Sequence, residues 1–332
     1  MEHKTRIKGN VHYVGVNDRN KHRFEGMWPL PYGVSYNSYL IDDEMVALVD
    51  TVDICYFEVY LRKIKQVIGE RPINYLIINH MEPDHSGSIR LIKQHYPEII
   101  IVGNKQTFGM IEGFYGVTGE QYLVKEGDFL ALGHHKLRFY MTPMVHWPET
   151  MMTFDETDGV LFSGDGFGCF GTVDGGFLDT RINVDKYWGE MVRYYSNIVG
   201  KYGSPVQKAL QKLGGLPISA ICSTHGPVWT ENIAKVIGIY DRLSRYDADE
   251  GVVIAYGSMY GNTEQMAEAI AEELSAQGVK NIVMHNVTKS HPSYIIADIF
   301  RYKGLIIGSP TYSNQIFPEV EALLSKILLR EV

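Results

Sequence analysis

Short apolar runs alternate with turn residues and helical patterns up to about residue 230 of the chain. Runs rich in β-branched and aromatic residues predict strands at 38–41, 46–49, 75–78, 99–102, 137–140, 159–162 and 220–222. Apolar positions spaced near 3.6 residues predict helices at 55–68, 88–95 and 186–199. Because these helices fall between the strands, the pattern predicts an α/β domain in which helices are layered on sheet.

A polar, charged segment at 241–250 is followed at once by a new apolar strand at 252–255. We place a domain boundary there, with a first domain at 1–249 and a second at 250–332. The second domain continues with a glycine-containing loop, a helix at 263–277, a strand at 281–285, a short helix, a strand at 305–307 and a helix at 318–329. This alternation is typical of a doubly wound parallel α/β domain.

Composition narrows the classes of partner and metal site. A chain of 332 residues fits two domains of unequal size, and its net charge of −8 without a long basic run argues against nucleic acid and anionic membranes as partners. No apolar run approaches the roughly 20 residues that span a bilayer, so we expect a cytoplasmic protein. Because Cys55, Cys169 and Cys222 lie far apart without a C-x-x-C pair, any metal must rest on histidine and carboxylate.

Potential metal ligands gather at the ends of predicted strands. The segment His80-Met81-Glu82-Pro83-Asp84-His85 follows the strand at 75–78, and Pro83 favours an extended backbone at Glu82, which would project alternate side chains to one side. Three further candidates each lie just past another strand: His146, Asp165 and His225. One such residue is more often a turn former or a helix cap. Seven of them, at the sheet edge where ligands usually bind, predict a metal site.

The run His80-x-Glu82-x-Asp84-His85 with the distant His146, Asp165 and His225 resembles the di-iron signature of the flavodiiron proteins, a branch of the metallo-β-lactamase superfamily. Zinc hydrolases of that superfamily carry a second histidine where this chain has Glu82. Imidazole suits zinc, whereas an additional carboxylate suits ferric iron. The resemblance implies an αββα sandwich in which His80, Glu82 and His146 hold one iron, Asp84, His85 and His225 hold the other, and Asp165 bridges them.

Two loops of the second domain resemble the FMN-binding loops of flavodoxins. The segment Ser258-Met259-Tyr260-Gly261-Asn262-Thr263 opens a helix, and the N–H groups at a helix N-terminus suit a phosphate, although such a turn alone is weak evidence. Its companion is the loop 309–314 after the strand at 305–307. The resemblance implies that the FMN phosphate lies at Ser258, Tyr260, Gly261, Asn262 and Thr263, and the flavin ring beside Pro310, Thr311, Tyr312 and Asn314.

A flavodoxin-like domain with strand order 2-1-3-4-5 needs two more strands after its third. Because the chain stops at Val332, the third strand would be an apolar edge, and either the natural protein is longer and this chain is truncated or its FMN is weakly held; we favour a truncated chain.

The activity that the resemblance implies is the reduction of dioxygen to water, of nitric oxide to nitrous oxide, or of both. The electrons pass through FMN from rubredoxin or another small donor, and the protein pairs head to tail as a homodimer. By family analogy Tyr195 assists proton transfer, although packing of one helix face explains this residue equally well. Two alternatives stay open: a zinc hydrolase acting through metal-bound hydroxide, and a non-catalytic electron carrier with a structural metal.

Overall fold

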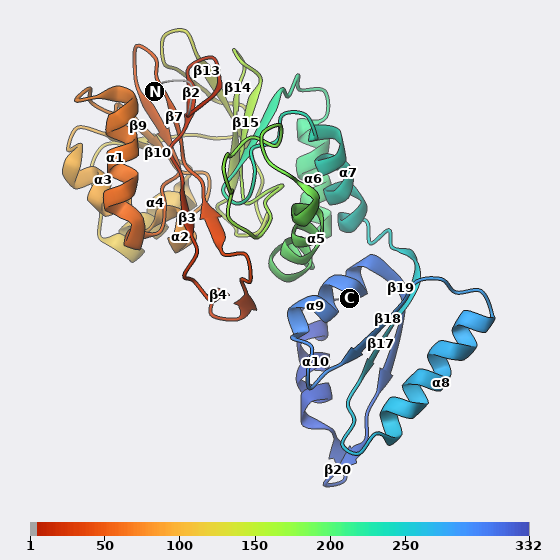
Figure 1. Ribbon diagram of the computed structural model, residues 1–332. Helices are drawn as coiled ribbons and strands as arrows, with labels where there is room; N and C mark the ends of the chain where they lie inside the picture. The colour runs from red at the N-terminus through yellow and green to blue at the C-terminus, as the bar shows by residue number, and fades with distance from the viewer. Residues whose placement is uncertain (1–4, 332) are drawn as a thin grey trace.

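Two β-sheets stacked face to face form the centre of the first domain (Figure 1). The structure is a computed structural model that describes residues 5–331. The larger sheet contains, in spatial order, β1 (Arg6–Lys8), β2 (Val11–Tyr13), β7 (Tyr39–Ile41), β8 (Ala47–Val49), β9 (Tyr75–Ile77), β10 (Ile100–Gly103) and β11 (Gln121–Leu123). The smaller sheet contains β12 (Phe129–Ala131), β13 (Lys136–Met141), β14 (Met151–Asp155), β15 (Val160–Gly164) and β16 (Ala220–Ser223).

Helices cover the outer face of each sheet (Figure 1). The larger sheet is covered by α1 (Phe57–Ile68), α3 (Ile89–His95) and α4 (Lys105–Tyr115), and the smaller sheet by α5 (Asp185–Tyr194), α6 (Gly203–Leu213) and α7 (Ile233–Ser244). Alternate strand residues face opposite layers: Ile41 and Phe162 pack between the sheets, whereas Leu40 packs beneath the helices. This is the αββα sandwich expected from the resemblance.

Two short strand pairs extend the larger sheet's side of the domain. The strand β3 (Val16–Asp18) pairs with β6 (Val34–Tyr36), and β4 (Arg23–Phe24) pairs with β5 (Trp28–Pro29). The hairpin of β4 and β5 reaches toward the second domain (Figure 1). Sequence analysis did not predict these strands, because two or three residues are too few to establish a period.

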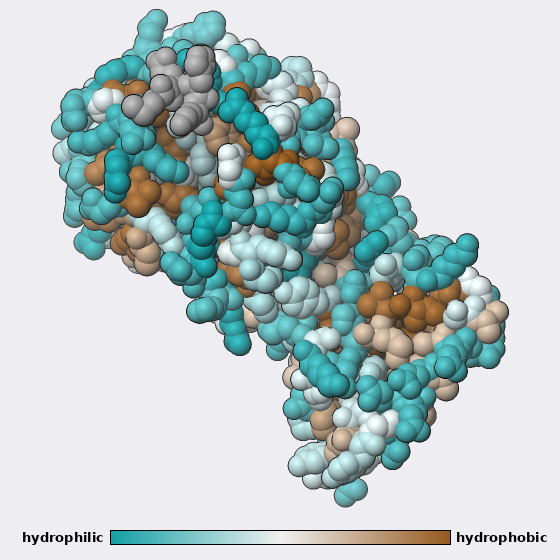
Figure 2. Space-filling model, in the orientation of Figure 1, coloured by the Kyte–Doolittle hydropathy of each residue, from teal (hydrophilic) through white to brown (hydrophobic). Residues whose placement is uncertain are grey.

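A parallel sheet in the order β18-β17-β19 forms the second domain. Its elements are β17 (Asp249–Tyr256), α8 (Asn262–Ala276), β18 (Ile282–Asn286), α9 (Pro292–Arg301), β19 (Tyr302–Gly308), the hairpin β20 (Thr311–Tyr312) with β21 (Gln315–Ile316), and α10 (Pro318–Leu328). This matches the first three strands of the predicted doubly wound order. The strand β19 lies at the edge of the described sheet, where Leu305 and Ile307 are partly exposed, and Figure 2 shows apolar side chains gathered on this domain.

The connection between the two domains is shorter than the charged segment at 241–250. Helix α7 continues to Ser244, and β17 begins at Asp249, beside the boundary that we predict from the sequence. The helix predicted at 186–199 is α-helical to Tyr194 and continues as a π-helical turn, η3 (Tyr195–Val199). Among residues 5–331, the helices are too short or too polar to traverse a bilayer.

Candidate metal centre

The loop after β9 brings four of the predicted ligands to the edge of the sheet. Glu82 has an extended backbone, with φ −57° and ψ 137°, as Pro83 dictates. The expectation that the extended segment also carries Asp84 is wrong, because Pro83 opens a short helix, α2 (Pro83–Ser86), that carries both Asp84 and His85. A proline at the first helical position is favoured there because its missing N–H is not needed. The helix nevertheless turns both side chains toward the site.

The remaining three predicted ligands come from loops of the smaller sheet. His146 lies between β13 and β14, Asp165 follows β15, and His225 follows β16. All seven residues are buried, and none is more than 7% exposed. The structure therefore brings together every ligand that the sequence indicated.

Their ligand atoms form two adjoining groups, one of His80, Glu82, His146 and Asp165 and the other of Asp84, His85 and His225. Within each group the nitrogen and oxygen atoms lie within 4.8 Å of one another. The Nε2 atoms of His85 and His225 are only 3.0 Å apart. Such convergence of histidine and carboxylate atoms is the arrangement that a pair of metal ions requires.

Asp165 faces both groups at once. Its Oδ2 lies 3.1 Å from His146 Nε2 and 3.4 Å from His80 Nε2. Its Oδ1 lies 3.2 Å from His85 Nε2 and 3.8 Å from His225 Nε2. One carboxylate is thus placed to give an oxygen to each of two ions.

Several buried polar atoms of this site have no hydrogen-bond partner within the chain. They include His80 Nε2, His85 Nδ1, both carboxylate oxygens of Asp84, Glu149 Oε2 and the hydroxyl of Tyr194. Buried polar atoms are almost always satisfied, and an unsatisfied carboxylate is costly. Metal coordination satisfies His80 Nε2 and Asp84, so these residues fit a two-metal centre.

Neighbouring groups fix the orientation of the imidazoles. Glu149 Oε1 lies 2.9 Å from His80 Nδ1, and the Nδ1 of His225 donates to the carbonyl of Ser35 at 2.8 Å. Both contacts leave Nε2 facing the site, which is the usual arrangement around metal-bound histidine. Sequence analysis missed Glu149, although it follows His146 by three residues, because its partner lies far away in the sequence.

The loop after β9, which carries four of the predicted ligands, is held in place by Asp50, which directly follows β8. Its carboxylate accepts from the backbone N–H of Asn79 at 2.7 Å and from that of His80 at 3.3 Å. Burial raises the pKa of Asp50 to about 6. Its place after a predicted strand was the same signal that identified Asp165 and His225.

Burial and charge oppose each other among the carboxyl groups. Burial disfavours ionisation of Glu82, but the nearby imidazoles of His146 and His80 lower its pKa to about 2. Burial and the nearby Glu82 raise the pKa of Asp84 well above its usual range. Burial also opposes ionisation of Asp165, but His80 and His85 lower its pKa well below its usual range. A bound cation would favour the ionised form of all three.

The structure does not bring the predicted Tyr195 to the ligand groups. Its ring packs against Tyr240 at 5.1 Å and against Phe300 of the second domain at 6.2 Å. The preceding residue, Tyr194, faces the site instead, with its ring 5.5 Å from that of His225. Burial and the nearby Asp165 raise the pKa of Tyr194 well above its usual range, so its hydroxyl keeps its proton. A one-residue offset on a helix rotates the side chain by about 100°, which a family analogy does not resolve.

The two predicted flavin loops lie side by side at the carboxyl ends of β17 and β19. Gly257 N–H donates to the carbonyl of Gly308 at 2.9 Å, so the loops start from adjacent strands. Gly261 has φ +91°, a conformation that suits glycine, and it caps α8, whose first turn carries Asn262 and Thr263. Ser258 Oγ accepts from Gly261 N–H at 3.1 Å, while Tyr260 is 90% exposed. Of the second loop, Pro310 is half-buried and precedes β20, which contains the exposed Thr311 and Tyr312, and Asn314 turns toward β21.

Comparison with known proteins matches both domains. Residues 34–226 match the family described as ODP family beta lactamase, and residues 254–331 match the flavodoxin family. Curated relatives named anaerobic nitric oxide reductase flavorubredoxin are 33% identical over 327 residues in Vibrio vulnificus and 32% identical in Escherichia coli O1:K1. The matches cover 97% of this chain and 66% and 68% of those proteins, so the chain spans about two thirds of their length.

Solved structures share the arrangement of the whole chain. The rubredoxin oxygen:oxidoreductase of Desulfovibrio gigas is 31% identical with a TM-score of 0.92, over 97% of this chain and 81% of that one. The flavodiiron protein of Giardia intestinalis is 28% identical with a TM-score of 0.93, over 97% of this chain and 78% of that one. The predicted fold class of both domains is therefore confirmed.

Proposed function

Because the chain belongs to the flavodiiron protein family, we propose that it reduces nitric oxide to nitrous oxide, dioxygen to water, or both, at a carboxylate-bridged di-iron centre. The observation that carries this proposal is the position of Asp165, whose two oxygens face two separate groups of ligands. The names of the relatives, as nitric oxide reductase and as oxygen:oxidoreductase, support the same two gases as substrates.

The ligand set favours iron. Glu82 stands where zinc hydrolases of the superfamily carry histidine, and it gives the first group two carboxylates beside two imidazoles. Carboxylate oxygen favours a hard, highly charged ion such as ferric iron, whereas imidazole and thiolate favour zinc. When bound, two ferrous ions and reduced FMN supply the four electrons that convert dioxygen to water, or the two that convert a pair of nitric oxide molecules to nitrous oxide.

The chain's own residues orient the candidate metal ligands and hold a proton near the place where substrate would bind. Glu149 and the carbonyl of Ser35 orient His80 and His225, and the buried aromatic rings of Phe24 and Tyr36 restrict access of water to His225. Burial and the nearby Asp165 keep the proton on the Tyr194 hydroxyl by raising its pKa, so this hydroxyl can donate a hydrogen bond to bound substrate. In this proposal Tyr194 takes the place that the sequence analysis gave to Tyr195.

The flavin loops are remote from the metal centre of the same chain. Figure 1 shows β20 and the start of α8 at the end of the second domain that faces away from the domain junction. A flavin held there faces outward, which supports transfer of electrons to the metal centre of a second copy in a head-to-tail homodimer. Rubredoxin or another small redox protein as donor, and a cytoplasmic location, are also part of the proposal.

The test uses iron-loaded protein supplied with FMN and reduced chemically without oxygen. Mixing with nitric oxide or dioxygen should consume the gas much faster than free reduced FMN does, with nitrous oxide or water as product. Asp165→Asn should abolish this, whereas Asp128→Asn, at an aspartate whose Oδ2 only accepts from Lys125 N–H, should not. Reoxidation no faster than that of free flavin would instead support the electron carrier.

The names of the relatives do not favour the alternative function, a zinc hydrolase. It predicts two bound zinc ions and hydrolysis of a thioester or similar bond by metal-bound hydroxide. Metal analysis of the purified protein, followed by thioesterase assays with the zinc-loaded form, distinguishes it from the reductase.

A further inference from the structure

The domain junction contains a buried arginine. Arg193 lies in the last turn of α5 and is only 2% exposed. Arginine is almost never fully buried unless it is paired, and here Nε donates to Glu190 Oε2 at 3.1 Å. A charge buried at the meeting point of two domains is costly to leave unpaired, so both domains are constrained by its contacts.

Arg193 contacts both domains with one guanidinium group. Its Nη1 donates to Ser293 Oγ of α9 at 3.0 Å, and its Cζ lies 5.0 Å from the ring centre of Tyr294. On the side of the first domain, the same Cζ lies 4.5 Å from the ring centre of Phe170. The planar fork of arginine can satisfy an ion pair, a hydrogen bond and ring contacts together, which lysine cannot do.

The π-helical turn η3 adds a further contact between the first domain and α9 of the second. Asn197 Nδ2 donates to the backbone carbonyl of Ser293 at 3.0 Å and to that of Arg193 at 2.7 Å. Gly200 N–H closes the turn on the carbonyl of Tyr195 at 2.7 Å. Arg193 and Asn197 therefore bind the same residue at the start of α9, and π-helical turns of this kind are often found at functional sites.

Through Phe170, the contacts of Arg193 extend to the candidate metal centre. The ring of Phe170 lies 5.0 Å from that of Tyr194 and 5.5 Å from that of Phe24. Those two rings lie 5.5 Å and 5.2 Å from the ring of His225. The guanidinium that binds the second domain thus rests on the aromatic wall around a predicted metal ligand.

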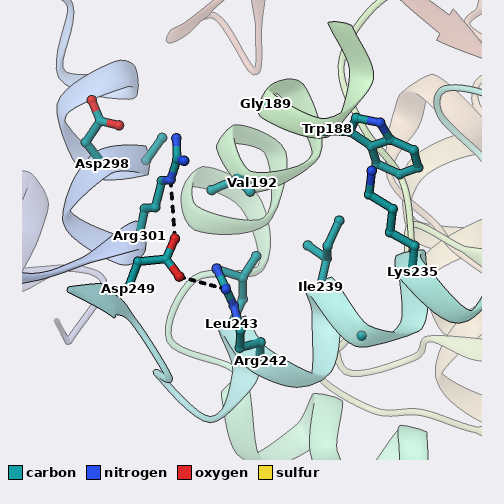
Figure 3. Close-up of a pocket in the computed structure, with 12 residues that line it drawn as sticks. Trp188, Gly189, Val192, Lys235, Ile239, Arg242, Leu243, Asp249, Asp298 and Arg301 are labelled. Carbon is teal, nitrogen blue, oxygen red and sulfur yellow. Dashed lines mark hydrogen bonds and ion pairs between the residues drawn. The ribbon is translucent and has the colours of Figure 1, made fainter. Parts of the chain in front are cut away.

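The outer side of the junction offers a contrast. There Asp249 pairs with Arg242 at 2.8 Å and with Arg301 at 3.5 Å, beside an open cavity of about 480 Å³ that Val192 and Ile239 also line (Figure 3). The side chain of Arg242 is 41% exposed. Exposed ion pairs of this kind contribute little to stability, so they constrain the domains weakly.

We propose that Arg193 is the positioning residue of the domain junction, which fixes the orientation of the flavodoxin-like domain on the metal-binding domain through Ser293 and Tyr294. The inference goes beyond the proposed reaction, because it concerns how the two domains are held and is independent of the substrate.

The test measures the distance between the domains in the full chain. Spin labels at Lys105→Cys and Gln277→Cys, both exposed, report on the first and second domain in a Cys55→Ser background, since Cys55 is the exposed thiol among the described residues. Dilution with unlabelled protein removes distances between subunits. Pulsed dipolar spectroscopy should give a narrow distance distribution in this parent protein.

Arg193→Met should broaden or shift that distribution and should raise amide exchange several-fold in α9. Arg242→Met is the matched control on the outer side of the same junction and should leave both readouts unchanged. If Arg193→Met does not fold, the double variant Arg193→Met with Glu190→Gln removes the unpaired carboxylate and should show the same broadening. A distribution unchanged in the folded Arg193 variant, or broadened equally by Arg242→Met, would overturn the proposal.

Discussion

Replacing Glu149 by glutamine is the most informative single change near the metal centre. The carboxylate lies 2.9 Å from His80 Nδ1 and accepts from Met81 N–H at 2.8 Å, and neither the Glu149 nor the His80 side chain is exposed. Glutamine keeps an oxygen that can accept both bonds, removes the negative charge and places an amide NH2 at Glu149 Oε2, a buried atom that has no hydrogen-bond partner within the described chain. The change therefore mainly tests the effect of that charge on the basicity of His80.

The expected loss is 10- to 100-fold in metal affinity, the usual effect of removing a group that orients a metal-bound histidine. This corresponds to about 1.4–2.8 kcal/mol, at about 1.4 kcal/mol for each tenfold change. Anaerobic competition between the protein and a ferrous chelator measures it. The affinity for an ion at His80, Glu82 and His146 should fall more than the affinity for an ion at Asp84, His85 and His225.

Glu126→Gln provides the matched control. Glu126 Oε2 also accepts from a backbone N–H, that of Met141 at 2.8 Å, and pairs with Lys212 at 2.7 Å, but its side chain is 48% exposed and belongs to neither ligand group. Equal iron affinity in the Glu149 variant and the parent, or an equal loss in both variants, would refute the reasoning.

Three other predictions have defined outcomes. Glu82→His should raise the ratio of zinc to iron bound from a mixed solution, because it restores the softer ligand set, and metal analysis by mass spectrometry measures that ratio. Tyr194→Phe should lower turnover with unchanged metal content, whereas Tyr195→Phe should leave turnover near that of the parent; a larger effect of Tyr195→Phe would contradict the placement of Tyr194. Burial opposes protonation of His135, but its hydrogen bond with Asp155 outweighs the effect of burial and raises its pKa. The pair therefore stabilises the fold fully below the unfolded-state pKa of about 6.5, and this stabilisation is lost as pH rises through the folded-state pKa. His135→Gln should accordingly lower the melting temperature most below about pH 6.5, and a deficit that grew with pH would reverse that sign.

Sequence patterns singled out the seven candidate metal ligands because these residues share one local signal. Asp165 and His225 follow buried strands, and the loop 80–85 follows another, so the edge of the sheet brings them together without long-range information. The same patterns did not identify Glu149 or Arg193, whose roles depend on partners distant in the sequence, His80 and Ser293. Their residue types alone indicated only polar surface.

Helical and strand elements were predicted only in part, because α4, α6 and α7 were missed although each is 11 or 12 residues long. The expected strands at 75–78 and 252–255 fall on β9 and β17. The strand β14 was missed, because all five of its residues are buried and its sequence MMTFD shows no alternation. The helix expected at 186–199 was correct in extent, but the local pattern showed neither its change to a π-helical turn at Tyr195 nor the contact of that residue's ring with Phe300 of the second domain.

Diffraction from crystals of iron-loaded protein, measured on both sides of the iron absorption edge, tests the di-iron centre most directly. We predict two anomalous peaks about 3.5–4 Å apart, one within bonding distance of each carboxylate oxygen of Asp165. A single peak, or peaks that appear only at the zinc edge, would contradict a di-iron centre at this position.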